Sequence, residues 1–380
     1  MPGCQGTRYD ALVLFTKTDA VLGLLALAML VPVKAQEKTG PVRLAVAGLV
    51  HGHVDGFLRA AQGRSDIQIV GLSDPDAALR HKYAAKFGLP ESIFFSNLRT
   101  MLEESKPEAV ASFTSTFDHP AVVEACARRG VHVMMEMPLA VDMAGARAIG
   151  HAAEQGGIQV IVNYETTWYR SHGAMWQILK QQAAAGAIRK MVAMDGHEGP
   201  KEIGVGPEFL GWLTDPAKNG AGALFAFGCY GANLMTWLMD NKRPVAVTAI
   251  TKRIKPQIYP QVDDEATVLV EYPRALGIIQ ASWNWPFGRK DFEVYAEKGY
   301  ANTVGGGILK VRLPGMAQEE VRTPPELPEM ERDSISYLAA VVRGKLKPAG
   351  LSSLENNLIV TEILSAARES AATGKRVVLR

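Results

Sequence analysis

The spacing of apolar residues differs between the two halves of the chain. In the first half, short runs such as Val42–Gly48 and Glu108–Phe113 are almost wholly apolar and alternate with stretches of helical spacing. Continuous apolar runs are typical of strands buried on both faces, and strands that alternate with helices form a parallel, doubly wound sheet. We therefore predict a Rossmann-type nucleotide-binding domain over residues 40–164.

Residues 165–380 contain runs in which apolar and polar residues alternate, which is typical of strands with one face buried. The runs predict strands over Ala246–Thr251, Ala266–Tyr272, Gly277–Trp283 and Phe292–Ala296. Before them we expect a helix over Ser171–Ala184, a strand over Lys190–Met194 and a long loop over 195–219. This half predicts an α+β substrate and oligomerisation domain with a large open, mainly antiparallel sheet. We expect its C-terminal amphipathic helices to pack back on the first domain.

Composition narrows the class of protein. A chain of 380 residues suggests two domains, and its 41 basic and 39 acidic residues imply no surface for nucleic acid or anionic membranes. Cys126 and Cys229 stand in apolar helical contexts, so we expect two buried thiols rather than a disulfide.

The N-terminal segment has the pattern of an export signal. Lys17 precedes an apolar run over 20–33, and Val33-Lys34-Ala35 has the small residues of a cleavage site. The run is shorter than the roughly 20 residues of a membrane-spanning helix. We predict a signal peptide over residues 1–35 and a periplasmic or extracellular protein, with no membrane association after cleavage. A retained N-terminal anchor is the alternative.

The turn after the first strand carries part of a dinucleotide-binding motif. Gly48 occupies the first position of Gly-x-Gly-x-x-Gly, but Val50 and His53 replace the second and third glycines. Asp74 follows the next strand, where a carboxylate suits two ribose hydroxyls and favours NAD over NADP.

Glu136 and Pro138 end the apolar run that begins at Val131, which predicts a strand whose carboxyl end faces a ligand crevice. A carboxylate that only caps the following helix is the alternative.

His51 and His53 could bind a metal together with a carboxylate, but ordinary turn histidines are favoured, and we assign no metal ligand.

Three motifs together resemble the Gfo/Idh/MocA family (glucose–fructose oxidoreductase, inositol dehydrogenase and relatives). They are Asp118-His119-Pro120, Gly130-Val131-His132-Val133 leading to Glu136-x-Pro138-Leu139, and Gly222-Ala223-Leu224 before Gly228-x-Tyr230-x-x-Asn233. The resemblance implies reversible hydride transfer between a nicotinamide and a sugar or cyclitol hydroxyl, and pairing of subunits across the open sheet. It places the cofactor beside Gly48, Val50, His51, Asp74, Thr114, His119, Glu136, Pro138 and Asn163.

Two positions depart from the family. Met137 replaces the lysine of Glu-Lys-Pro, and Ala226 replaces an aspartate two residues before Gly228. Tyr230 resembles a tyrosine that can act as an acid in the glucose–fructose oxidoreductase branch. The catalytic candidates that remain are Tyr230, Glu136, His197 and Glu165, with His172 and Asp195 as further groups that could face the crevice. For all except Tyr230, a solvated loop group is an equal alternative.

Downstream of the crevice, Trp168 or Tyr169 could stack on a sugar, with core packing as the equal alternative. We predict an oxidoreductase that holds NAD(P) tightly and acts on a carbohydrate. The alternatives are a non-redox lyase or glycoside-cleaving enzyme on the same fold, and a non-catalytic carbohydrate-binding relative. The sequence also leaves open whether Met137 and Ala226 were introduced.

Overall fold

The computed structural model describes residues 40–379. The predicted signal peptide, residues 1–35, lies outside the described residues. Within the described part of the chain, no helix combines the length and the apolar character needed to cross a membrane.

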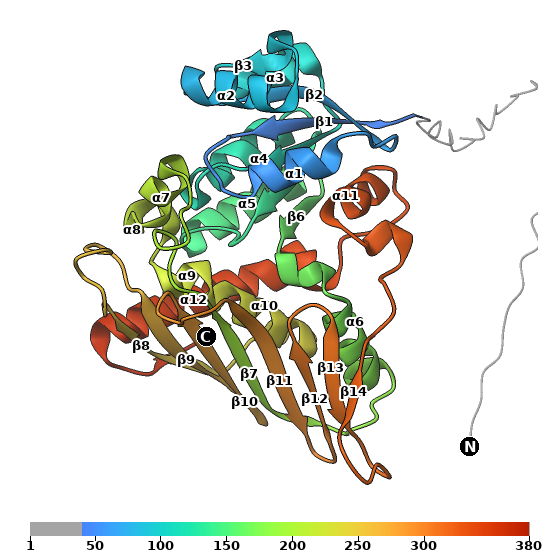
Figure 1. The fold of residues 1–380 in the computed structure, drawn as a ribbon, viewed down its shortest axis with the longest axis vertical. Coiled ribbons are helices and arrows are strands. Elements are labelled where there is room, and N and C mark those ends of the chain that lie inside the picture. The colour runs from blue at the N-terminus through green and yellow to red at the C-terminus, as the bar shows by residue number, and fades with distance from the viewer. Residues whose placement is uncertain (1–39, 380) are drawn as a thin grey trace, which may run out of the picture. The chain divides into compact units, whose positions relative to one another are not determined.

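The first sheet has six parallel strands in the order β3-β2-β1-β4-β5-β6 (Figure 1). The strands are β1 (Val42–Ala47), β2 (Ile67–Ser73), β3 (Phe94–Phe95), β4 (Ala109–Ser112), β5 (His132–Glu136) and β6 (Val160–Asn163). Every residue of β4 is buried, as the apolar pattern requires when helices cover both faces of a sheet. The chain reverses its direction of winding between β1 and β4, and ligands bind at such a point.

Helices connect these strands. They are α1 (Val54–Ala61), α2 (Ala77–Phe87), α3 (Leu98–Ser105), α4 (His119–Ala127) and α5 (Met143–Gly156). Local sequence sets their ends: the Asp76 carboxylate accepts from the backbone N–H groups of Ala78 and Leu79 at the start of α2, and Gly88 ends it in the left-handed conformation.

The second sheet has nine strands in the order β14-β13-β12-β11-β7-β10-β9-β8-β15. Its strands are β7 (Ile188–Gly196), β8 (Ala246–Lys252), β9 (Glu265–Tyr272), β10 (Ala275–Ser282), β11 (Arg289–Ala296), β12 (Tyr300–Val304), β13 (Ile308–Arg312), β14 (Glu320–Arg322) and β15 (Val377–Val378). Strands β7 and β10 are parallel, and the other pairs are antiparallel. The predicted fold, a Rossmann-type sheet followed by a mainly antiparallel sheet, is confirmed.

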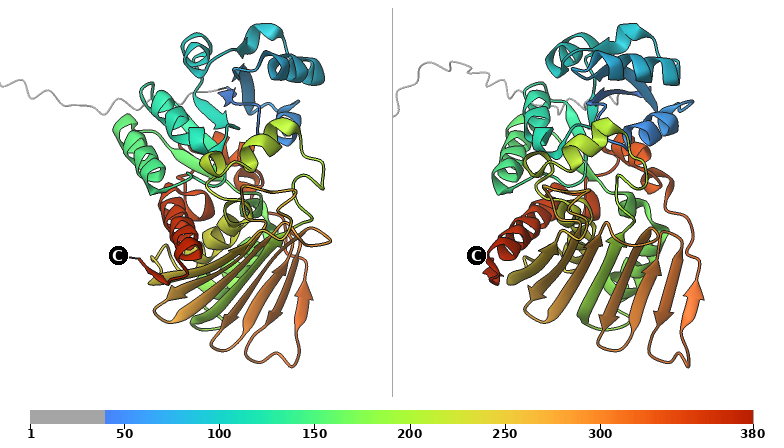
Figure 2. Two further views of the ribbon diagram at one scale, coloured as in Figure 1. Left: turned by 90° about the vertical axis from the view of Figure 1, so that its left-hand side faces the viewer. Right: turned by 60° about the vertical axis from the view of Figure 1, so that its left-hand side comes forward.

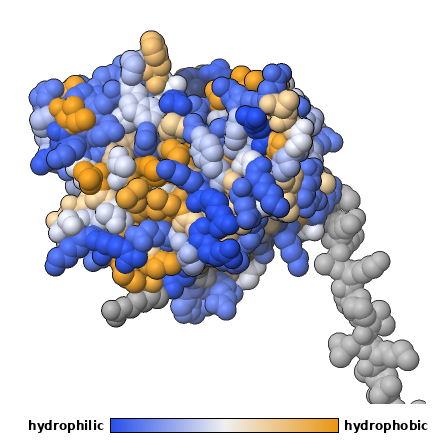
Figure 3. Space-filling model, turned by 90° about the horizontal axis from the view of Figure 1, so that it is seen from below, coloured by the Kyte–Doolittle hydropathy of each residue, from blue (hydrophilic) through white to orange (hydrophobic). Residues whose placement is uncertain are grey.

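Helices cover one face of the second sheet and leave the other without any (Figure 2). Those that contact the covered face include α6 (Arg170–Trp176), α10 (Gly228–Leu238) and α12 (Leu354–Thr373). Exposed apolar side chains of the sheet include Ile250, Leu269 and Tyr295. Figure 3, which views the molecule from below Figure 1, shows apolar groups interspersed with polar ones.

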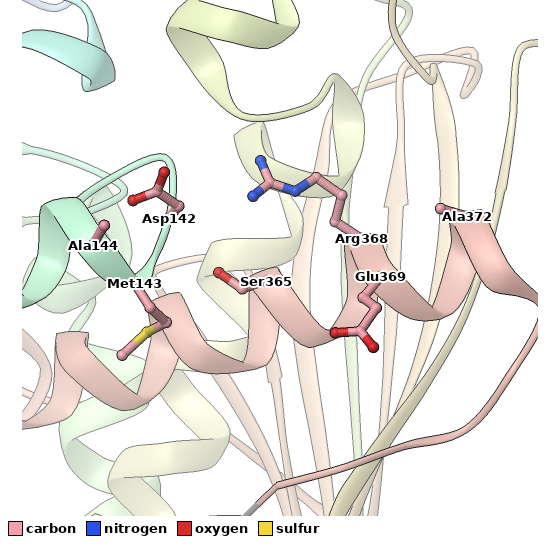
Figure 4. A pocket seen from close by; sticks show the side chains of 7 residues that line it. All are labelled: Asp142, Met143, Ala144, Ser365, Arg368, Glu369 and Ala372. Atoms are coloured by element: carbon pink, nitrogen blue, oxygen red, sulfur yellow. The ribbon is translucent and has the colours of Figure 1, made fainter.

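The remaining helices lie in the connections between these elements. They are α7 (Pro207–Leu213), α8 (Pro216–Asn219), α9 (Ala223–Ala226) and α11 (Ser334–Val342), with the 3-10 helices η1 (Glu91–Ile93), η2 (Thr116–Asp118), η3 (Glu165–Trp168), η5 (Glu329–Glu331) and η6 (Gly350–Ser352). Helix α9 also contacts β9 and β10 of the second sheet. Buried residues of α11 join the apolar core of the first sheet. A pocket between α12 and the start of α5 is lined by Asp142, Ser365 and Arg368 (Figure 4). Arg368 donates to the carbonyls of Val141 and Gly220.

Three of these expected elements differ from the structure by three residues or more. The helix predicted over Ser171–Ala184 is α6 followed by a π-helical turn over Gln177–Gln181. The segment expected to be a loop over 195–219 begins with the last two residues of β7 and contains α7 and α8, whose prolines start helices rather than break them. Strand β11 begins three residues before its predicted first residue, Phe292, because the charged residues that precede Phe292 pair with β7.

Cys126 and Cys229 are buried free thiols, as predicted.

Candidate active site

A cavity of about 680 Å³, here called the central cavity, lies where the ends of strands from both sheets meet. The β1–α1 turn contributes His51 and His53, and the segment after β5 contributes Met137 and Pro138. Glu165 follows β6, and the second sheet and its helices supply His197, Tyr230 and Lys290. Five of the predicted site residues therefore line one cavity: His51, Pro138, Glu165, His197 and Tyr230.

Glu136 ends β5 beside this cavity with 2% of its surface exposed. Its Oε2 accepts from Nδ1 of His53 at 2.9 Å, and its Oε1 accepts from Nδ2 of Asn163 at 2.7 Å. Burial opposes ionisation of Glu136, but the neighbouring His53 and the hydrogen bonds outweigh it and lower the pKa of the carboxyl. Glu136 is an anion held from two sides, which goes beyond the role of a helix cap.

His51 is buried in an aromatic environment. Its ring centroid lies 4.7 Å from that of Phe209 and 5.4 Å from that of Trp212, both on α7. Burial, reinforced by the neighbouring His53, lowers the pKa of His51 to about 3, so the imidazole is neutral. The backbone N–H of His53 donates to Nδ1 of His51 at 3.1 Å.

Lys290 lines the central cavity, and no motif in the sequence singled it out. It lies on β11, forms an ion pair with Glu165, and places its Nζ 4.4 Å from the ring centroid of Tyr230. It is the only lysine among the described residues that line the central cavity. No local pattern in the sequence marks it, because only the pairing of β11 with β7 brings it there.

Glu165 and Tyr230 flank this ammonium. Burial opposes ionisation of Glu165, but Lys290 and the 2.6 Å hydrogen bond from Tyr169 lower the pKa of the carboxyl. Tyr230 is 2% exposed, and burial raises the pKa of its phenol well above the ordinary value. Tyr230 is therefore a neutral phenol that can donate a hydrogen bond, and the Lys290 ammonium lies over its ring.

Asp195 lies directly opposite Lys290 in the pairing of β7 with β11. Its carboxyl is 2% exposed, and Oδ2 has no hydrogen-bond partner among the described residues. Burial raises the pKa of Asp195 to about 8, although the Lys290 ammonium opposes the shift. The group is therefore protonated at neutral pH.

The other predicted histidines play different structural roles. His197 lines the central cavity, accepts the backbone N–H of Gly199 at Nδ1, and has a pKa lowered by burial. His119 and His172 are buried outside the lining of the cavity, and each donates from Nδ1 to a backbone carbonyl. The structure does not bring His119 or His172 to the cavity surface.

A second pocket of about 190 Å³ has the residues expected to hold an adenosine. Gly48, Val50, Asp74 and Thr114 line it. Asp74 accepts from the backbone N–H groups of Leu49 at 2.7 Å and Asp76 at 2.9 Å, and its oxygens retain lone pairs for ribose hydroxyls. Gly48 has φ +82°, and a Cβ there would lie 2.7 Å from Cγ2 of Thr114, so the turn requires glycine.

The β1–α1 turn connects the two pockets, since Val50 lines the smaller one and His51 the central cavity. These residues fit a dinucleotide that extends across the turn. Val50 takes the place of the glycine expected at the second position of the motif. Helix α7 packs on the same turn, where Trp212 Nε1 donates to the Val50 carbonyl at 3.3 Å and Phe209 covers Gly52.

Of the two aromatic candidates, Tyr169 lines the central cavity and Trp168 does not. The Trp168 indole donates to Asn163 at 2.9 Å and packs on Tyr337. Met137 and Ala226, the two positions expected to depart from the family motif, both line the central cavity.

The fold and the paired pockets define a class: a Rossmann nucleotide-binding sheet joined to an open-sheet substrate domain. Two family models match, one described as the oxidoreductase family with an NAD-binding Rossmann fold over residues 42–164, the other as the GFO/IDH/MocA C-terminal domain over residues 174–302. The chain belongs to the Gfo/Idh/MocA family.

Three relatives illustrate the similarity, each at 24% identity or less. Trans-1,2-dihydrobenzene-1,2-diol dehydrogenase of Sus scrofa is 24% identical over 237 residues, which span 62% of this chain and 65% of that enzyme. The match thus covers less than two thirds of that relative. 1,5-Anhydro-D-fructose reductase of Ensifer adhaerens is 21% identical over 339 residues, covering 85% and 93% of the two chains. The structure of an inositol dehydrogenase homologue from Azotobacter vinelandii complexed with NAD+ superimposes with a TM-score of 0.76 at 18% identity, covering 89% and 97%.

Proposed function

We propose that this protein binds NAD and a sugar or related polyol, and that it is a slow oxidoreductase for the bound hydroxyl or carbonyl group. Family membership supports the cofactor, and Asp74 at the end of β2 supports NAD over NADP. The relatives' names support the substrate class, since they act on a dihydrodiol and an anhydro sugar. The single observation that carries the proposal is the set of Tyr230, Lys290 and Glu165 on one wall of the central cavity.

Different residues bind the nucleotide and the reacting oxygen of the substrate. Asp74 and the turn after Gly48 hold the nucleotide, and Glu136 accepts a hydrogen bond from His53 at the edge of the central cavity. When bound, the nicotinamide supplies or accepts a hydride. Tyr230 donates a hydrogen bond to the substrate oxygen, and Lys290, fixed by Glu165, stabilises negative charge that develops there.

Slow turnover follows from Met137 and Ala226. A thioether and a methyl group hold no transferable proton, so two of the three proton-handling positions of the family contribute nothing. Loss of one positioned proton-transfer group typically removes about 10² to 10⁴ in rate. We infer tight retention of the cofactor from the proposed export, because free nicotinamide nucleotides are scarce outside the cytoplasm.

The first experiment asks whether a nucleotide is bound. The purified protein is denatured and the supernatant examined for nicotinamide by absorbance and mass. Released nucleotide, or a thermal shift on addition of NAD, is the expected result. Absence of both would refute nucleotide binding.

The second experiment restores the family residues with Met137→Lys and Ala226→Asp. Sugar oxidation by the double variant should rise about 10²-fold or more. The matched control is Met330→Lys with Ala372→Asp, which adds the same two charges at exposed positions away from the cavity. An equal rate in both double variants would show that the cavity is not a disabled dehydrogenase site.

A second candidate function, a non-redox lyase or glycoside-cleaving enzyme, is favoured by the contact of Glu136 with His53 beside Glu165 and Tyr230, which supplies acid and base groups without a nicotinamide. Cleavage of a glycoside by nucleotide-free protein would support it. Sugar binding without turnover would instead identify a binding protein.

We also propose that the protein is exported and that subunits pair through the uncovered face of the second sheet. The apolar pattern of residues 20–33 supports export, and the exposed side chains of Ile250, Leu269 and Tyr295 support pairing. Light scattering of the wild type and of Ile250→Glu tests the oligomer; a monomer in both would refute it.

A further inference from the structure

Two histidines and a carboxylate meet at the edge of the central cavity. His51 and His53 come from the β1–α1 turn, and Glu136 from the end of β5. One ligand atom from each residue lies within 4.8 Å of the other two. Among residues 40–379, no other group of three or more histidine, cysteine, aspartate or glutamate side chains is arranged in this way.

This combination of groups suits a transition metal. Two imidazoles and one carboxylate form a common three-ligand zinc site, in which the fourth position stays open for water or substrate. Bonds of about 2.0–2.2 Å in tetrahedral geometry place ligand atoms roughly 3.4 Å apart. Nδ1 of His53 and Oε2 of Glu136 are 2.9 Å apart and no two ligand atoms are more than 4.8 Å apart, so side-chain shifts of about 1 Å would bring the three to this spacing.

The surroundings orient the ligands. Asn163 donates to Oε1 of Glu136 at 2.7 Å, which leaves Oε2 directed toward His53, and Trp168 in turn donates to Asn163 at 2.9 Å. The rings of Phe209 and Trp212 pack against His51. Hydrogen bonds from outer residues to ligating carboxylates are characteristic of metal sites and tune their affinity.

The site also faces the cavity. His51 and His53 line the central cavity, and the side chain of His53 is 47% exposed. Lys290, the nearby ammonium, is paired with Glu165, which reduces its repulsion of a second cation. An open coordination position would therefore point toward the space that holds the substrate.

We propose that His51, His53 and Glu136 bind one divalent metal ion of the zinc class, with the remaining position open to the central cavity. The proposal goes beyond hydride transfer, because the ion would bind in the absence of any nicotinamide. When bound, the ion would polarise a substrate oxygen or a water molecule. The competing explanation is a metal-free ion pair between His53 and Glu136.

The test uses the full chain, stripped of metal with a chelator and dialysed. Zn²⁺ binding is measured by competition with a chromophoric chelator, and the metal content after dialysis by mass spectrometry. We expect one ion per chain and a melting temperature that rises with Zn²⁺ concentration. His53→Gln should abolish this site, and Asn163→Ala, which removes no ligand, should weaken it about 10- to 100-fold.

His81→Gln is the matched control. His81 forms an exposed pair with Glu91 at 3.1 Å that has the same two residue types, so its loss should leave Zn²⁺ binding unchanged. The half-exposed His53 can be replaced without opening the core, and circular dichroism confirms that each variant is folded. Wild type that binds no Zn²⁺, or Zn²⁺ binding that is equal in His53→Gln and His81→Gln, would overturn the proposal in favour of the ion pair.

Discussion

Replacement of Asp195 by asparagine should change how the stability of the protein depends on pH. Asp195 is 2% exposed, and Oδ2 lacks a hydrogen-bond partner among the described residues. Burial raises its pKa from 3.8 to about 8 despite the opposing charge of Lys290. Asparagine has nearly the same shape and cannot ionise, so the variant isolates the titration of this one group.

The sign of the effect follows from proton binding. Between the unfolded and folded pKa values, the folded protein holds a proton on Asp195 that the unfolded chain has released. The contribution of this group to the free energy of unfolding therefore falls by about 1.4 kcal/mol for each pH unit in that window. Between pH 5 and pH 7 the loss is about 2.5 kcal/mol, and it levels off above pH 8.

Urea unfolding of both proteins between pH 5 and pH 9 measures this difference. We expect Asp195→Asn to gain about 2.5 kcal/mol relative to wild type as the pH rises from 5 to 7. The control is Asp66→Asn, since the hydrogen bond from Arg64 keeps the pKa of Asp66 below its ordinary value and the group is ionised throughout this range. Parallel curves for wild type and Asp195→Asn would show that Asp195 ionises normally, and would refute the argument from burial.

Two further predictions concern the β1–α1 turn and the cavity. Gly48→Ala should destabilise the protein by about 2–4 kcal/mol in urea unfolding, because alanine is strained at φ +82° and its Cβ would meet Thr114 at 2.7 Å. Gly56→Ala, within α1 and with open space around it, should instead be neutral or stabilise by up to about 1 kcal/mol; equal losses in both would contradict this account. Lys290→Met should raise the pKa of Asp195 further, so stability should keep falling to a higher pH than in wild type, and an unchanged profile would show that the two groups do not interact.

Local sequence determined the architecture to a large extent. The apolar runs that become β1 and β4 predicted a parallel sheet because strands covered on both faces need apolar side chains throughout. Alternating residues in β9 and β10 predicted a sheet with one uncovered face for the corresponding reason. Glu136 and Asp74 could be placed at strand ends because an apolar run that stops at a carboxylate marks the edge of a sheet.

The bounds of helices and strands were less predictable where the residue types are unusual for the structure that they adopt. The first residues of β11 are arginine, lysine and aspartate, which read as a turn, yet hydrogen bonding to β7 extends the strand through them. Likewise, the prolines between residues 195 and 219 suggested a loop, although at the first positions of α7 and α8 they favour helices.

The chemistry of the cavity depended on contacts between distant segments, and the sequence alone could not define them. The sequence did determine that positions 137 and 226 hold a thioether and a methyl group, neither of which carries a transferable proton. Only the tertiary structure decided that Lys290 lies beside Tyr230, and that Glu136 meets His51 and His53 across more than 80 positions of the chain. Strand register sets these distances, and register depends on backbone pairing between segments that carry no mutual signal in the sequence.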